Sequence, residues 1–183
     1  MGMRRPRYNM GSADWIGVEA LGVPGSRTFR LLAYGRGDAA QLWLEKEQLQ
    51  ALAEAIARML AEISGEAGVD LNALEPHSNP KPPGFPENPE IEIFVGALGL
   101  RYDSQNDLIA MEAFDRDAED DAAPAFSCLA TRWQLEALQS NSLEVITAGR
   151  PRCPLCGTPL SSPGIPHFCP PSNGHHRLTG DEE

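Results

Sequence analysis

The sequence QLWLEKEQLQAL, residues 41–52, changes from a strand pattern to a helix pattern within a few residues. Its first four residues form a short apolar run, which is typical of a strand. From residue 46 to residue 63, apolar side chains recur at the 3.6-residue spacing of an amphipathic helix, and Gly65 supplies a stop signal. This stretch therefore predicts a strand that leads directly into a helix.

A second stretch, FSCLATRWQLEAL at residues 126–138, has the same organisation. It predicts a strand over residues 126–130 and a helix over residues 131–147, with Gly149 as the stop. Thr131 and Gln134 have the spacing of a capping box, which satisfies backbone N–H groups at the start of a helix. The two stretches superpose with Gln48 on Gln134, and their identity is confined to Gln-Leu-x-Ala-Leu.

The segments upstream of the two joins extend this likeness. Strands are predicted before the first helix over residues 15–20, 28–34 and 41–44, and before the second helix over residues 91–102, 108–114 and 126–130. Each half therefore reads as strand, strand, strand, helix. We predict an α+β body of two similar βββα halves that arose by internal duplication. The alternative is an ordinary α+β domain with two similar strand-to-helix joins.

The expected organisation of the whole chain follows from these halves and the segments around them. It consists of a flexible N-terminus (1–13), the first half (14–65), a Pro-rich linker (66–90), the second half (91–149), a zinc-binding tail (150–178) and an acidic end (179–183). The linker holds six prolines, which favour extended chain with few hydrogen bonds. We expect it to be solvated; the alternative is a proline-rich ligand for a partner.

The tail carries the spacing of a small zinc site. In RCPLCG, residues 152–157, a Cys-x-x-Cys turn directs the thiolates of Cys153 and Cys156 at one point. Cys169 follows about a dozen residues later, the return distance of a zinc loop. His167 is the preferred fourth ligand because an extended His-x-Cys places both side chains on one side of the backbone, and His175 is the alternative.

Three thiolates and an imidazole leave no open position, so the tail predicts a structural Zn²⁺ ion in a zinc-ribbon-like fold. Two other interpretations compete with zinc. A redox dithiol normally opens a helix, which Pro154 and Gly157 oppose here. The other interpretation is a disordered tail with accidental spacing. The fourth cysteine, Cys128, stands alone in an apolar strand and is expected to be a buried small hydrophobe.

Charge and hydropathy restrict the class of protein. Residues 9–148 contain 9 Lys+Arg and 23 Asp+Glu, a net charge of −14 (9 − 23), within a chain of net charge −11. An acidic body argues against a general nucleic-acid binder, because phosphate contacts need a positive surface. No apolar run approaches the roughly 18 residues of a membrane span, and no apolar stretch follows the N-terminal arginines, so we expect a cytoplasmic protein without membrane contact.

The sequence also resembles a known family in three blocks. The first is the tail, with RCPLCG, then His167-Phe168-Cys169-Pro170 and Asn173-Gly174. The second is GVPGSRTF at residues 22–29, and the third is VGALGLRYD at residues 95–103. Together they are similar to a family of uncharacterised bacterial proteins of about this length, a domain of unknown function that ends in a Cys-Pro-x-Cys-Gly tail. The resemblance implies this fold outline and the zinc tail, and it implies no reaction.

Two arginines follow similar glycine turns in the two halves, Arg27 after Gly25 and Arg101 after Gly99. Paired arginines bind carboxylates and phosphates, so Arg27 and Arg101 are candidate anion-binding residues. All four histidines lie in the linker or the tail, and both halves therefore lack the commonest general base.

These observations favour a non-enzymatic binding or adaptor protein with a structural zinc ion and a protein partner. One alternative is an enzyme or sensor that binds an acidic or phosphorylated small molecule through Arg27 and Arg101. A second alternative is an RNA-associated zinc module, which the basic residues of the tail favour and the acidic body opposes. No feature of the sequence predicts an oligomeric state.

Overall fold

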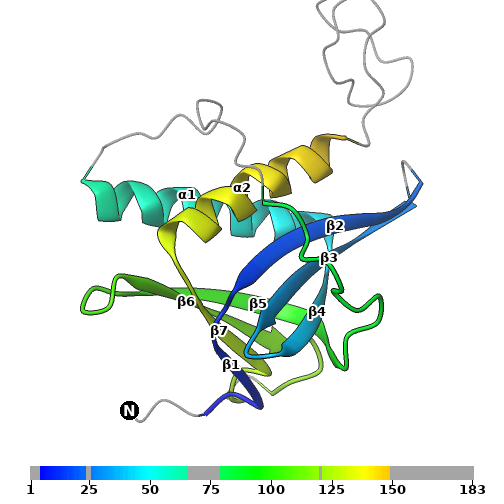
Figure 1. Cartoon of the computed structure of the whole chain (residues 1–183), viewed down its shortest axis with the longest axis horizontal. Coiled ribbons are helices and arrows are strands. Elements are labelled where there is room, and N and C mark those ends of the chain that lie inside the picture. The colour runs from blue at the N-terminus through cyan, green and yellow to red at the C-terminus, as the bar shows by residue number, and fades with distance from the viewer. Residues whose placement is uncertain (1–4, 24–25, 66–78, 120, 149–183) are drawn as a thin grey trace, which may run out of the picture. The chain divides into compact units, whose positions relative to one another are not determined.

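The structure is a computed structural model that describes residues 5–23, 26–65, 79–119 and 121–148. Its strands are β1 (Tyr8–Ser12), β2 (Trp15–Val23), β3 (Ser26–Gly35), β4 (Asp38–Leu44), β5 (Ile91–Asp103), β6 (Leu108–Asp115) and β7 (Phe126–Ala130). Its helices are α1 (Lys46–Ser64) and α2 (Arg132–Thr147) (Figure 1). The predicted α+β class is confirmed, and both predicted helices start within one residue of their expected positions.

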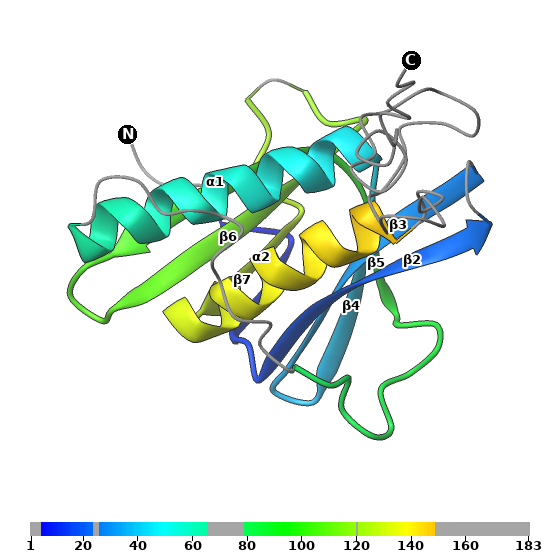
Figure 2. The same ribbon diagram turned by 90° about the horizontal axis from the view of Figure 1, so that it is seen from above.

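All seven strands belong to one sheet in the order β1-β7-β6-β5-β4-β3-β2. Two neighbouring pairs are parallel, β4 with β5 and β1 with β7, and the other pairs are antiparallel. Both helices lie on the same face of this sheet (Figures 1 and 2). We call the face that the helices cover the inner face and the opposite face the outer face.

The two ends of the sheet lie close together. Strands β1 and β2 are the last strands at either end, yet only Ala13 and Asp14 separate them in the chain. The N–H of Ala13 donates to the carbonyl of Leu129 in β7, and the next N–H, of Asp14, donates to Tyr34 in β3, both at 2.8 Å. The sheet must therefore curl until its edge strands meet at this bend.

The expectation that residues 1–13 are flexible does not hold for residues 8–12. These residues form β1, which pairs in parallel with β7 from Tyr8 opposite Phe126 to Ser12 opposite Leu129. The segment YNMGS has no strong strand pattern, because only Met10 faces the core. Its extended conformation comes from pairing with β7, which lies more than a hundred residues later in the chain.

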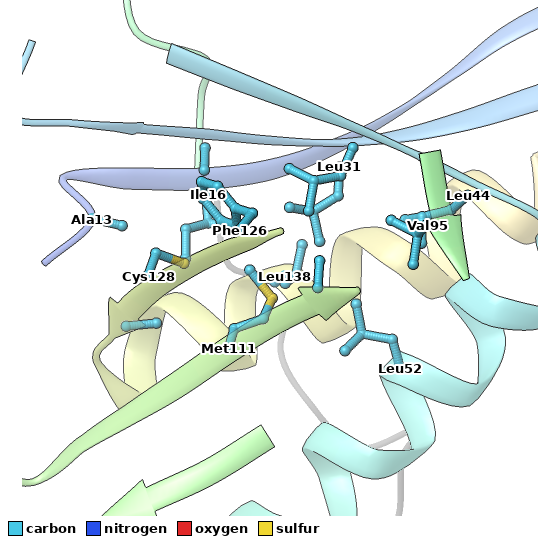
Figure 3. Packing of buried hydrophobic residues seen from close by; sticks show 14 of the residues in the cluster. Ala13, Ile16, Leu31, Leu44, Leu52, Val95, Met111, Phe126, Cys128 and Leu138 are labelled. Carbon is cyan, nitrogen blue, oxygen red and sulfur yellow. The ribbon is translucent and has the colours of Figure 1, made fainter. Parts of the chain in front are cut away.

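The core lies between the inner face of the sheet and the two helices. Figure 3 shows side chains from both layers meeting in one cluster, with Leu52 of α1 and Leu138 of α2 near Met111 of β6. Leu49, Leu52, Ile56 and Leu60 form one buried stripe of α1, as the helical periodicity predicts. No helix in the described part of the chain has the length and apolar character to cross a bilayer.

The two strand-to-helix joins are built alike. At the start of α1, the side-chain oxygen of Gln48 accepts a hydrogen bond from the backbone N–H of Glu45 at 2.8 Å. At the start of α2, the side-chain oxygen of Gln134 accepts a hydrogen bond from the backbone N–H of Thr131 at 2.9 Å. The capping box predicted at Thr131 is thus present. The amide nitrogen of each glutamine also donates to a bent part of the sheet, Gln48 to Val95 at 3.0 Å and Gln134 to Ala13 at 2.8 Å.

The second part of the Pro-rich linker, residues 79–90, packs on the sheet. Trp15 donates its indole N–H to the carbonyl of Asn79 at 3.2 Å, and the Asn79 amide donates to the carbonyl of Ile16 at 2.7 Å. The ring of Phe85 lies 5.6 Å from that of Trp15 and 6.3 Å from that of Tyr34, between centroids. Residues 79–90 thus contact the sheet through a few side chains, while most of them are exposed to solvent as expected of a solvated linker; residues 66–78 lie outside the described residues.

Candidate functional site

The predicted zinc ligands Cys153, Cys156, His167 and Cys169, and the alternative His175, lie outside the described residues. Within the described ranges, no three His, Cys, Asp or Glu side chains come together in a way that could hold a metal ion. Cys128 is fully buried in β7, as expected for a small hydrophobe, and burial raises the pKa of its thiol to about 12.

The two candidate anion-binding arginines lie on different strands and contact different groups. Arg27 belongs to β3, opposite Gly22, and donates to the carbonyl of Val145 in α2 at 3.5 Å. Arg101 belongs to β5, opposite Ala110, and lies 3.9 Å from the Glu112 carboxylate. The resemblance of the two glycine turns in sequence therefore does not correspond to equivalent positions in the sheet.

The hairpin between β5 and β6 is held by its own charged groups. Asp107 accepts hydrogen bonds from the hydroxyl of Tyr102 at 2.8 Å and from the guanidinium of Arg132 at 2.8 Å. These hydrogen bonds lower the pKa of the Asp107 carboxyl. Asp103 accepts the backbone N–H of Gln105 within the turn. Both carboxylates have the structural partners expected of turn residues, and Asp107 joins the hairpin to the start of α2 through Arg132.

A row of stacked aromatic and cationic side chains crosses the outer face at β3, β4 and β5. Its members are Arg30 of β3, Trp43 of β4, Phe94 of β5 and Arg116, which directly follows β6. The Arg30 guanidinium lies 5.8 Å from the Trp43 ring, and Trp43 stacks on Phe94 with 6.5 Å between centroids and 18° between planes. The Arg116 guanidinium then lies 4.8 Å from the Phe94 ring. We call these four residues the arginine–aromatic row.

Beside this row, a network of hydrogen-bonded polar groups centred on the buried Gln41 holds it in place. Glu92 accepts hydrogen bonds from the indole N–H of Trp43 at 2.7 Å and from the amide of Gln41 at 3.0 Å. Arg30 donates to Gln41 at 2.9 Å and to Glu19 at 2.9 Å. Because each of these groups has a partner, Trp43 has a fixed position on the sheet.

The Glu19 carboxylate lies between two cations, Arg30 at 2.9 Å and Lys81 at 2.7 Å. Partial burial opposes ionisation of Glu19, but hydrogen bonds from Lys81 and Arg30 outweigh burial and lower its pKa. Lys81 belongs to the packed linker, and Arg30 also donates to the Glu87 carbonyl of that linker at 3.2 Å. The polar groups therefore attach residues 79–90 to the row.

A cavity of about 480 Å³ opens at the end of the row, where β4 leads into α1. Its walls include Trp43, Phe94 and Arg116, and its polar lining includes Glu45 and Glu92. A second cavity of about 510 Å³ runs between α1 and β5, and its lining is mostly apolar: Ala51, Leu52, Ala55, Met59, Val95, Leu98 and Leu100, with Gln48, Arg58 and Glu62. Gln48 and Val95 line both cavities, so the two are neighbours.

Sequence reasoning missed this surface. Phe94 is 43% exposed, although four of the five residues in segment 91–95 are apolar. The available signal was its phase, because alternation along a strand places Phe94 on the side of Glu92, opposite Ile93 and Val95. Its approach to Trp43 and Arg116 came from strand pairing, which the sequence pattern did not predict.

Comparison of the chain with curated proteins and with solved structures gave no match. A family model matches residues 8–169, which is most of the chain and includes every residue of the arginine–aromatic row. The match also includes Cys153, Cys156, His167 and Cys169, whereas His175 lies beyond it. The expected membership of an uncharacterised family is confirmed: the chain belongs to the family described as Protein of unknown function (DUF3090).

Proposed function

We propose that this protein is a non-enzymatic binding protein, built from two βββα units, whose C-terminal segment carries a structural zinc ion. The observation that carries the binding role is the stack of Trp43 on an exposed Phe94 beside a cavity. Aromatic and arginine side chains are the groups that most often anchor protein partners.

The proposal of two βββα units is supported by the parallel pairing of the third strand of each unit. Ala40 of β4 lies opposite Ile91 of the second unit, and Phe126 of β7, 86 residues later (126 − 40), lies opposite Tyr8 of β1, the strand that precedes the first unit. The third strand of each unit therefore pairs in parallel with a strand outside its own unit. The matching roles of Gln48 and Gln134 at the helix starts add a second correspondence, at the same offset of 86 residues (134 − 48).

The proposal of a zinc ion is supported by the cysteine spacing and by the extent of the family match. The preferred ligands all fall within residues 8–169, and the last matched residue is Cys169, the third cysteine of the tail. A tetrahedral Cys₃His site would hold together a segment rich in proline and glycine, which has few residues suited to a hydrophobic core.

The zinc proposal is tested by metal content. Purified protein is expected to contain one zinc ion per chain, which Cys153→Ser and Cys169→Ser remove and the matched control Cys128→Ala retains. His167→Asn is expected to lose the ion and His175→Asn to keep it. Protein without zinc that has four titratable thiols in denaturant would contradict the proposal.

The binding role is tested by photo-crosslinking. Benzoylphenylalanine replaces Phe94 in one variant and Tyr8 in a control, because Tyr8 is 39% exposed and also lies under an arginine, Arg7. A discrete crosslink to another protein is expected in cells from position 94 and not from position 8. Equal crosslinking at both positions, or none at position 94, would contradict the binding role of this surface.

A further inference from the structure

The cavity at the end of the arginine–aromatic row has the chemistry of a site for a cation. We propose that it binds an arginine side chain of an extended partner segment, whose following apolar residues enter the second cavity along α1. This inference rests on the proposed binding role and specifies the chemistry of the partner.

The protein already places guanidinium groups on these rings. Arg30 and Arg116 lie over Trp43 and Phe94, so the geometry suits a flat cation on an aromatic face. The two arginines are held differently. Arg30 is largely covered and donates to Glu19 and Gln41, whereas the side chain of Arg116 is 60% exposed.

Arg116 is therefore the replaceable member of the row. Its ion pair joins it at 3.7 Å to Asp117, an exposed neighbour in sequence, and such surface pairs contribute little stability. A partner arginine that took its place over Phe94 would keep the cation–π contact. It would also gain the two carboxylates of the cavity lining, Glu45 and Glu92.

Charge complementarity favours a basic partner over an acidic one. The lining has two carboxylates against one guanidinium, and that guanidinium already has Asp117 beside it. Residues 9–148, which include every lining residue of the cavity, carry a net charge of the same sign, −14 (9 − 23). A field of this sign attracts cations and speeds their association.

The second cavity specifies what accompanies the arginine. It continues from the first through Gln48 and Val95, and its lining from Ala51 to Leu100 is mostly apolar. An extended chain places successive side chains alternately, about 3.3 Å apart along the strand. A segment with arginine followed by leucines at alternate positions would therefore fill both cavities.

The experiment uses the full chain, labelled with ¹⁵N, and three blocked peptides that differ at one position. Each peptide carries two leucines at alternate positions after arginine, citrulline or glutamate. Citrulline has nearly the shape of arginine and no charge. The arginine peptide is expected to shift the amide signals of Glu92, Phe94 and Val95 and to bind about tenfold more tightly than the citrulline peptide. Its affinity is expected to fall as salt is added.

Two variants give opposite expectations, with a third as control. Phe94→Leu is expected to lower the affinity for the arginine peptide about tenfold, because the aromatic face is lost. Arg116→Gln is expected to raise the affinity for the arginine peptide severalfold, because the protein's own guanidinium no longer competes for the Phe94 ring. Tyr8→Leu, which removes another exposed aromatic residue under an arginine, is expected to change nothing.

The inference is overturned if arginine and citrulline peptides bind equally, or if neither shifts the signals of the cavity. It is also overturned if the glutamate peptide binds best and Arg116→Gln abolishes that binding, which would make Arg116 the anchor of an anion site. A crosslinked partner at position 94 together with any of these results would leave the binding role standing and refute the cationic chemistry alone.

Discussion

Gln139 is a buried amide on α2 whose nitrogen and oxygen both have no hydrogen-bond partner among the described residues. A buried amide without partners destabilises the folded state, because it loses its hydrogen bonds to water. Gln139→Met keeps the length of the side chain and removes the polar atoms. We expect this variant to raise the free energy of unfolding by about 1–2 kcal/mol, measured by urea denaturation.

A matched control for this prediction lies five residues earlier (139 − 134) on the same helix. Gln134 is also buried, but its amide donates to Ala13 at 2.8 Å. Gln134→Met is therefore expected to lower the free energy of unfolding, by about 1–2 kcal/mol. A loss of stability in both variants would mean that Gln139 does contribute a polar interaction.

Cys128 provides a prediction with a defined pH dependence. Burial raises the pKa of its thiol from 9.0 to about 12, so the folded protein binds this proton more tightly than the unfolded chain does. The contribution of the protonated Cys128 thiol to the free energy of unfolding is complete below pH 9 and is lost as the pH rises toward 12. The loss is expected to be about 1.4 kcal/mol per pH unit above pH 9.

The measurement compares a protein in which the three tail cysteines are serine with the same protein carrying Cys128→Ala. The difference in their unfolding free energies is expected to shrink between pH 9 and pH 10.5. In the first protein, a thiol reagent at pH 8 is expected to modify Cys128 only after denaturant is added. Rapid modification of the folded protein would contradict the burial of Cys128.

At the scale of single elements, the two glutamines at the helix starts are a natural pair for comparison. Gln48→Ala and Gln134→Ala each remove a capping interaction and a hydrogen bond to the bend of a strand. We expect each to lower the free energy of unfolding by about 1–2 kcal/mol, with the larger loss for the more deeply buried Gln134.

Urea denaturation of both variants and of the exposed control Gln50→Ala would check this prediction. Within the described residues, the exposed Gln50 side chain bonds only to Glu54 on the same helix face, so its replacement is expected to change stability by a few tenths of a kcal/mol. If the Gln48 and Gln134 variants were as stable as the Gln50 variant, the joins would not depend on these side chains.

At the scale of the whole molecule, residues 79–90 contribute to the fold by packing on the outer face. Phe85→Ala removes the ring that contacts Trp15 and Tyr34. Because Phe85 is only partly buried, we expect a loss of about 1–2 kcal/mol, below the range for a fully buried phenylalanine.

Fluorescence of Trp15 supplies a local readout for this variant. Loss of Phe85 is expected to expose the indole and shift its emission to longer wavelength, with Trp43 and Trp133 replaced by phenylalanine in both proteins compared. Pro83→Ala, which changes an exposed residue of the same segment, is the control. Unchanged emission and stability for Phe85→Ala would contradict packing of the segment.

Local patterns accounted for most of the elements. The helix starts at Lys46 and Arg132 follow from apolar periodicity and cap residues, which depend on neighbours within one or two turns. Burial of Cys128 follows from its place in an apolar strand. The strand β1 was missed because its five residues have little pattern and are held by β7.

For the part of the chain that the structure describes, the sequence by itself determined the α+β class, both helices and six of the seven strands, because hydrophobic period and turn residues act over short distances along the chain. Only the tertiary structure decided the parallel pairs, the docking of residues 79–90 and the arginine–aromatic row. Trp43 and Phe94 lie 51 residues apart (94 − 43), and no local pattern specifies that they stack. Their contact results from β4 pairing with β5, whose register is set by packing of both strands against one shared core.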